Sequence, residues 1–208
     1  MGTLILHPTP LAEWQALVLE AKDRNSYSIT QEIECYLIFL LMRFASKPEI
    51  ANSIVALDFL KNIEQFKQES SQVRQERLES LKDLGDKCLL FAGLFPGRAQ
   101  KRRVRISYYV RLGQMAYSSL SEEKNSNLAE LYADLAEHFV ILMDIMHCMR
   151  EIDENVTAID LLQAEELWSD TRSLHALSTL KKSTQGFMPA NIFPFHFNHH
   201  PNTSSRTH

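Results

Sequence analysis

The sequence lacks the motifs that usually mark an enzyme. Only six of its 208 residues are glycine, and neither a Gly-rich phosphate loop nor a Gly-x-Ser-x-Gly nucleophile elbow occurs. The three cysteines, Cys35, Cys88 and Cys148, have no Cys-x-x-Cys spacing and lie within apolar helical patterns. We therefore expect buried free thiols, and neither disulfides nor a zinc site.

Signals for secretion or membrane attachment are also missing. The N-terminal stretch MGTLILHPTP has no positively charged region and no long apolar core, and Leu6 stands where a myristoylation motif requires Ser or Thr. The longest apolar run, Tyr36 to Met42, is far shorter than the ~20 residues that span a bilayer. These absences predict a cytoplasmic protein that does not associate with membranes.

Charge is scarce in total but unevenly distributed. The formal net charge is −4, and 45% of the residues are apolar, which suits one compact domain with a substantial core. Residues 87–121 contain seven Lys or Arg and no Asp or Glu, so this segment carries +7 and the remainder −11. A polarised chain of this kind has one place where an anionic partner would bind.

Hydrophobic periodicity predicts helices along most of the chain, and no strand hairpin or internal repeat is found. The first helix begins at Thr9-Pro10 and the second near Ser28, with Gln31 as its capping-box partner. The expected ranges are 10–22, 28–46, 50–67, 70–94, about 109–120, 126–152, 158–169 and 173–184. Residues 103–110 have enough β-branched and aromatic side chains to begin in an extended conformation. The sequence therefore predicts an all-α, single-domain bundle of about seven to eight helices over residues 1–185.

Two helices deserve separate expectations. The segment Tyr36 to Met42 is apolar on nearly every side, which is typical of a central, buried helix. Glu32 and Glu34 precede it in the first turn, where they either pair with a basic residue or form a buried carboxylate with a raised pKa. The long segment 126–152 is strongly amphipathic and is expected to be continuous.

The last residues, 186–208, change composition abruptly. They read GFMPANIFPFHFNHHPNTSSRTH, with three prolines, four phenylalanines and four histidines. Proline forbids a long helix here, and the phenylalanines favour contact with other apolar surface. The alternatives are an extended arm that docks on the helices or on a second subunit of a homodimer, and a disordered tail.

Metal ligation is not favoured, although Asp134 with His138 and Asp144 with His147 have spacings that helical di-metal proteins use. At ~100° per residue, the two histidines point about 180° apart and cannot share one site. A second Glu-x-x-His motif, which di-iron bundles require, is absent. We expect hydrogen-bonded histidines beside an apolar face, and no metal or cofactor.

Two glycines predict a close helix contact. Gly85 and Gly113 both fall on core-facing positions of predicted helices, where glycine costs ~1 kcal/mol relative to alanine. We expect an antiparallel crossing with Gly85 near Gly113. Asp86 would border it, satisfied by Arg111, Tyr108 or Tyr109, so Asp86, Tyr108 and Tyr109 form a candidate polar cluster.

The same region carries a resemblance. The pattern Gly85-Asp86-x-x-Leu89-x-Phe91, then Phe95-Pro96, then Ser107-Tyr108-Tyr109-x-x-x-Gly113-x-x-Ala116-Tyr117 resembles that of a group of uncharacterised bacterial proteins. Leu161-Leu162, the stretch from Trp168 to Ser173, Leu180 and Gly186-Phe187-x-Pro189 are similar to the C-terminal part of that group. The resemblance implies that residues 85–117 are the signature region, and it implies no activity.

The strongest candidate for a binding site is the basic part of residues 93–113, GLFPGRAQKRRVRISYYVRLG. Its cationic side chains are Arg98, Lys101, Arg102, Arg103, Arg105 and Arg111. They are suited to contact phosphates or carboxylates, and Tyr108 or Tyr109 to stack on a base. The alternative is a solvated loop that pairs with the acidic remainder of the chain. No helix-turn-helix or RNA-binding signature accompanies the segment, so sequence-specific nucleic-acid recognition is not expected.

Three functions are compatible with these patterns. The first is a non-catalytic binding or regulatory module that uses residues 98–111 for an anionic ligand or a protein partner. The second is a structural homodimer joined through the Phe-rich tail. The third is an enzyme on a helical bundle, for which the candidate participants are Asp86, Tyr108, Tyr109, Glu34 and His138.

Overall fold

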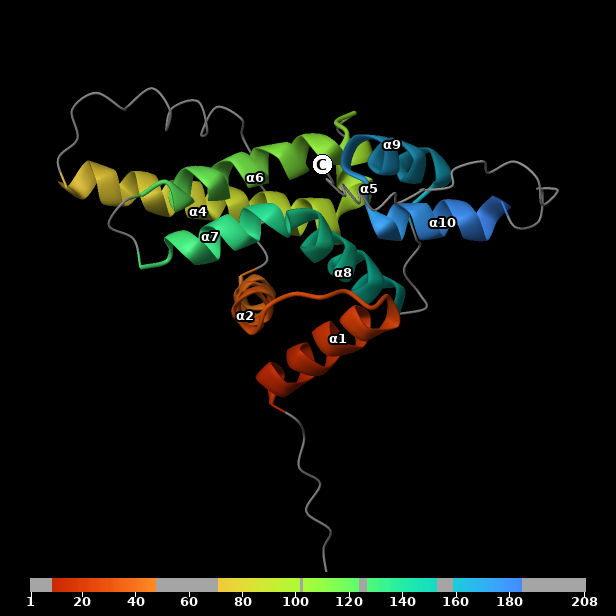
Figure 1. Ribbon diagram of the computed structural model, residues 1–208, viewed down its shortest axis with the longest axis horizontal. Helices are drawn as coiled ribbons and strands as arrows, with labels where there is room; N and C mark the ends of the chain where they lie inside the picture. The colour runs from red at the N-terminus through yellow and green to blue at the C-terminus, as the bar shows by residue number, and fades with distance from the viewer. Residues whose placement is uncertain (1–8, 48–70, 102, 124–126, 153–158, 185–208) are drawn as a thin grey trace, which may run out of the picture.

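A computed structural model describes residues 9–47, 71–101, 103–123, 127–152 and 159–184 (Figure 1). Within these ranges the chain forms nine helices and no strand, which confirms the predicted all-α bundle. The expected helix over 50–67, the tail 186–208 and Arg102 lie outside the described residues. None of the described helices has an apolar stretch long enough to cross a membrane.

Threonine hydroxyls begin the first two helices, α1 (Pro10–Arg24) and α2 (Gln31–Ser46). The Thr9 hydroxyl accepts a hydrogen bond from the Ala12 N–H at 3.3 Å, as the Thr9-Pro10 pair predicts. In α2 the N-cap is Thr30, whose hydroxyl accepts from the Ile33 N–H at 3.4 Å. The expected start at Ser28 was therefore wrong, because the extended backbone of Thr30 is what places a hydroxyl over the first free N–H groups.

Helix α2 buries one face and exposes the other among the described residues. Its buried side chains are Ile33, Leu37, Ile38, Leu40 and Leu41, which recur at helical spacing. Phe39 and Cys35 lie on the opposite side, and both are exposed. The expectation of a helix buried on all sides was wrong, and so was the expectation that Cys35 is buried, whereas Cys88 and Cys148 are buried as predicted.

The centre of the bundle is a pair of long helices, α4 (Ser71–Leu94) and α6 (Ile106–Ser121), which lie side by side and antiparallel (Figure 1). A Cβ atom placed on Gly85 would lie 2.5 Å from Tyr117 Cε1, and one on Gly113 would lie 2.9 Å from Cys88 Cβ. The predicted close contact is confirmed, but each glycine faces a side chain instead of the other glycine. Glycine is needed because the side chains of Tyr117 and Cys88 occupy the space that a methyl group would fill.

Between these two helices, α5 (Pro96–Lys101) forms a short helix where the sequence indicated only a turn. Helix α6 then begins at Ile106, so the extended conformation expected at the start of residues 103–110 is present at Arg105, with φ −66° and ψ 146°, and ends there. The reason is tertiary: Ile106, Tyr109 and Val110 are buried at helical spacing against the core. Packing of this apolar face outweighs the weak β propensity of the individual residues.

The long helix expected over 126–152 is divided in two, α7 (Ala129–Glu137) and α8 (Phe139–Ile152). His138 stands between them with φ −88° and ψ 9°. Both its backbone N–H and its ring Nδ1 donate to the carbonyl of Asp134 at 2.9 Å. A side chain that competes for a helical carbonyl is a known cause of a bend. The break directs Phe139 into the contact at Gly113.

The last two described helices, α9 (Leu161–Thr171) and α10 (Leu174–Thr184), form a helical hairpin that packs on α6 and α8 (Figure 1). Only Arg172 and Ser173 separate them. Arg172 adopts the left-handed conformation, with φ 61°, and its guanidinium lies 5.2 Å from the ring of Trp168. This hairpin brings α9 beside the turn that joins α5 to α6, which is where the basic segment lies.

Candidate functional site

The basic segment lies on the surface, over α5, the turn 103–105 and the first turns of α6. Arg98, Lys101, Arg103, Arg105 and Arg111 are all exposed. Arg102, also predicted here, lies outside the described residues. We call the five described side chains the basic surface. The structure thus leaves the five described cations exposed along α5, the turn and the start of α6.

The backbone of this turn is unusual at Arg103. Its φ is 55°, which is the left-handed region that favours glycine. The Val104 N–H donates to the carbonyl of Ala99 at 3.0 Å, the closing bond of a Schellman motif at the end of α5. An arginine therefore occupies the position where such motifs usually have glycine, at a cost of about 1 kcal/mol.

Arg105 is the member of the basic surface that pairs with the protein's own acidic residues. Its guanidinium lies 3.4 Å from the carboxylate of Asp170 and 3.7 Å from that of Glu166, both on α9. The Ser107 hydroxyl donates to Asp170 at 2.7 Å. This hydrogen bond, followed by the positive charges of Arg105 and Arg111, lowers the pKa of Asp170. For Arg105 the expectation of a loop that pairs with the acidic remainder is confirmed.

The remaining members of the basic surface have no such partner. Within the described ranges, no carboxylate forms an ion pair with Arg98, Lys101, Arg103 or Arg111. Arg98 lies over the ring of Phe95, 4.4 Å from its centroid, and keeps its charge exposed to solvent. Arg98, Lys101 and Arg103 are therefore exposed cations without an ion-pair partner among the described residues.

A groove of about 290 Å³ separates the turn from α9. Its lining comes from both sides and mixes charged, polar and apolar side chains: Arg103, Val104, Arg105, Ile106, Ser107, Leu162, Gln163, Glu166 and Leu167. No sequence pattern connects the two sides, which are separated by more than fifty residues along the chain. The groove borders the basic surface, because Arg103 and Arg105 line it, and extends it towards α9.

The predicted polar cluster of Asp86, Tyr108 and Tyr109 does not form. Asp86 is buried in α4, Tyr109 is buried against Phe91 with ring centroids 5.4 Å apart, and Tyr108 is exposed. Neither tyrosine contacts Asp86, and neither does Arg111. The prediction was wrong because Asp86 faces a different part of α6, two turns beyond Tyr109, and the element that covers it is α2.

The true partners of Asp86 are two tyrosines and an arginine. Tyr36 and Tyr117 donate their hydroxyl protons to one carboxylate oxygen at 2.6 and 2.7 Å, and Arg43 pairs with the other oxygen. Burial, and then the negative charge of Asp86, raises the pKa of Tyr36 and of Tyr117, so both stay protonated and donate. Both carboxylate oxygens of Asp86 are therefore paired within the fold, whereas the buried Arg43 Nε has no hydrogen-bond partner among the described residues.

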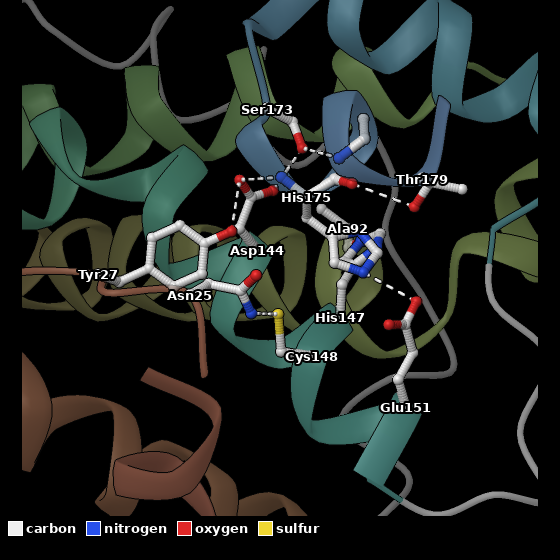
Figure 2. Close-up of polar contacts among 11 residues, drawn as sticks. Asn25, Tyr27, Ala92, Asp144, His147, Cys148, Glu151, Ser173, His175 and Thr179 are labelled. Atoms are coloured by element: carbon white, nitrogen blue, oxygen red, sulfur yellow. Dashed lines mark hydrogen bonds and ion pairs between the residues drawn. The ribbon is translucent and has the colours of Figure 1, made fainter. Parts of the chain in front are cut away.

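A second buried network surrounds Asp144 of α8 (Figure 2). Its carboxylate accepts hydrogen bonds from the Ser173 hydroxyl at 2.5 Å, the His175 backbone N–H at 3.2 Å and the Tyr27 hydroxyl at 3.4 Å. Ser173 in turn accepts from the Ala176 N–H at 3.0 Å. Burial raises the pKa of Asp144, and these hydrogen bonds oppose that rise. Asp144 and Ser173 together cap the N-terminus of α10.

Two histidines pack edge to face beside this network, with ring centroids 5.0 Å apart. His147 Nε2 lies 2.8 Å from the carbonyl oxygen of Ala92, so we assign the ring proton to Nε2. Burial, followed by the charge of His175, lowers the pKa of His147 to about 3, which keeps it neutral. His175 Nε2 lies 2.9 Å from Glu151 Oε1, and this bond lowers the pKa of Glu151.

The thiol beside the second network is not activated, and no metal site is formed there by the described residues. Asn25 donates to Cys148 Sγ at 2.9 Å, and burial raises the pKa of this thiol to about 12, so it does not form a nucleophilic thiolate at neutral pH. In the part of the chain that the structure describes, no three His, Cys, Asp or Glu side chains are placed to hold a metal ion. The buried polar groups connect α8 to α10 and to the α1 to α2 linker.

The other residues proposed for catalysis are separated from one another. Glu34 forms an ion pair with Lys22 at 2.6 Å, which bears out the structural interpretation of this glutamate. Glu32 is exposed, and His138 serves the bend between α7 and α8. The sequence reasoning missed Tyr27, Tyr36, Arg43 and His175, since none of them belongs to a motif.

Comparisons with known proteins were made at the level of family, sequence and fold. No match was found among protein-family models, curated proteins or solved structures. The candidate functional site is therefore identified from the residues of the chain itself, as the basic surface with its groove.

Proposed function

We propose that this protein is a non-catalytic binding module that engages an anionic partner through the basic surface. The proposal rests on the conformation and exposure of Arg103. Its side chain is exposed, it forms no ion pair within the described residues, and its backbone is in the left-handed conformation. Backbone strain at an exposed charged residue is typical of positions kept for binding.

Arg172 can be compared directly with Arg103. It also has a left-handed backbone, but its guanidinium lies on Trp168, so an intramolecular contact accounts for arginine there. Arg103 has no comparable contact among the described residues. A binding role for its charge supplies the reason that packing does not.

The two buried networks favour a binding module over an enzyme. Asp86, Asp144, His147 and Ser173 are all at most 1% exposed, and the partners of both carboxylates are supplied by the protein itself. A catalytic group must reach its substrate at hydrogen-bonding distance. The exposed charge and the groove are on the surface, where a partner has access.

The test exploits the strain at Arg103. Arg103→Gly removes the charge but relieves the left-handed backbone, so we expect the free energy of unfolding to stay unchanged or to rise by up to about 1 kcal/mol. At the same time the protein should elute from immobilised heparin at lower salt than wild type, because a cationic contact is lost. Urea unfolding and salt-gradient elution measure the two effects.

Arg172→Gly is the matched control, since it makes the same substitution at the same backbone conformation. It should leave heparin elution unchanged. A second pair has equal charge change: Lys101→Gln with Arg103→Gln should weaken retention, and Lys47→Gln with Lys182→Gln should not. The proposal is overturned if heparin does not retain the wild-type protein at about 50 mM salt. It is also overturned if each variant with a substitution at Arg103 elutes at the same salt concentration as its control variant.

A further inference from the structure

We infer that the partner of the basic surface is a protein segment that presents apolar side chains beside acidic ones, and not a nucleic acid. This inference rests on the proposed function and names the chemistry of its partner. Three features of the groove between the α5 to α6 turn and α9 support it: exposed leucines, a row of carboxylates, and a cationic edge on the opposite side.

The leucines stand at the start of α9. Leu161 is 52% exposed and Leu162 is 65% exposed, and Leu162 lines the groove together with Val104, Ile106 and Leu167. An exposed leucine that lines a hollow is a surface that an apolar side chain covers favourably. A phosphate backbone has no group that would benefit from contact with them.

The carboxylates lie further along the same helix. Glu165, Glu166 and Asp170 line a second hollow of about 240 Å³, which shares Arg105, Leu162 and Glu166 with the groove. Asp170 is held in its charged form by the hydrogen bond from Ser107 and by the nearby arginines. A continuous row of phosphates that crossed from the basic surface into the groove would meet these like charges, and its binding would be weakened.

The cationic edge completes the arrangement. Arg103 lines the groove together with Leu162, and Lys101 and Arg98 are exposed on the adjoining helix α5. A segment whose apolar side chain enters the groove can place a neighbouring carboxylate at Arg103 without approaching the acidic side of α9. Such alternation of apolar and acidic residues within one short segment is a property of proteins.

Three fluorescent probes of similar negative charge test the inference by anisotropy. The first is a synthetic twelve-residue peptide of alternating leucine and glutamate pairs, the second replaces its leucines by alanine, and the third is a single-stranded oligonucleotide. We expect the leucine peptide to bind roughly tenfold more tightly than the alanine peptide, because leucine side chains are buried in the complex. The oligonucleotide should bind more weakly than the leucine peptide.

Variants locate the effect in the groove. Leu162→Ser should remove the difference between the two peptides, while Arg103→Gly should weaken both of them. Phe39→Ser is the matched control, since Phe39 is 61% exposed on α2 and is remote in sequence from the groove. It should bind all three probes as wild type does, and circular dichroism checks that each variant is folded.

The possible outcomes distinguish the inference about the partner from the proposed anion binding. If both peptides bind equally well, if Leu162→Ser leaves their difference intact, or if the oligonucleotide binds most tightly, the inference about the partner is wrong while anion binding stands. If none of the three probes binds at low salt and heparin retains no protein, both the inference and the proposed function are wrong.

Discussion

The interior and the basic surface of this protein treat charge in opposite ways. Inside, the carboxylate of Asp86 is met by two tyrosine hydroxyls and an arginine, and that of Asp144 by three donors. On the surface, four of the five described cations between α5 and α6 have no ion-pair partner in the described ranges. Buried charge must be satisfied within the fold, whereas exposed charge costs little and remains available for another molecule.

The largest effect is expected when a buried carboxylate is removed. Asp86→Ala leaves Arg43 and the hydroxyls of Tyr36 and Tyr117 without their acceptor, so we expect the free energy of unfolding to fall by about 3–5 kcal/mol. Urea unfolding followed by circular dichroism measures the loss.

Asp83→Ala is the control for this substitution, since Asp83 is exposed on the same helix. Its effect should stay within about 0.5 kcal/mol. Equal effects of the two substitutions would mean that the network around Asp86 does not stabilise the fold.

A smaller loss is expected at the close contact between α4 and α6. Gly113→Ala places a methyl group against Cys88 and the ring of Phe139, and the displaced side chains should cost about 1–3 kcal/mol of stability. Gly97→Ala is the matched substitution on α5, where a Cβ atom would meet nothing within 4 Å.

Gly97→Ala should be neutral or stabilising, since alanine is the better helix former. Thermal unfolding of the two variants distinguishes the positions. A Gly113→Ala variant that unfolds at the wild-type temperature would show that the helices separate at no cost, contrary to the close approach.

The dependence of stability on pH provides a third test of the interior, because the buried His147 is neutral. Its folded pKa of about 3 lies below the ordinary value, so the unfolded chain takes up a proton first as the pH falls below about 6.5. Stability therefore decreases with falling pH, by roughly 1 kcal/mol between pH 6 and pH 5 from this residue alone.

The His147→Gln variant lacks this titration and should lose correspondingly less stability over the same interval. The shifted carboxyl groups nearby, Asp144 and Glu151, are present in both proteins, so the difference between the two slopes isolates His147. Identical slopes in urea unfolding at pH 6 and pH 5 would contradict a buried, neutral histidine.

The pattern of helices could be predicted from the sequence because its causes are local. Thr9-Pro10 begins α1, the apolar periodicity of 70–94 defines α4, and the composition of 98–111 indicates an exposed cationic segment. The errors had two causes. The ring of His138 competes for the carbonyl of Asp134 and interrupts a continuous apolar pattern, and Ile106 joins a helix in spite of its β propensity because it is buried against the core.

The partners of the buried charges could not be predicted in the same way. Helical periodicity indicates which face of α4 is apolar, but not that α2 lies opposite it, so Tyr36 and Arg43 were missed as ligands of Asp86. His175 and Ser173 reach Asp144 from a hairpin about thirty residues further along. No pattern within one segment records such a contact.

By itself, the sequence determined the all-α fold class, the positions of most helices, the need for glycine between α4 and α6, and the concentration of positive charge around residues 98–111. These depend on conformational preference, periodicity and charge, which act over a few neighbouring residues. Only the tertiary structure decided which helix covers each buried carboxylate, that Arg103 has a left-handed backbone, and that Leu162 of α9 stands across a groove from it. Those facts depend on how helices pack against one another, and packing is settled by the whole core at once.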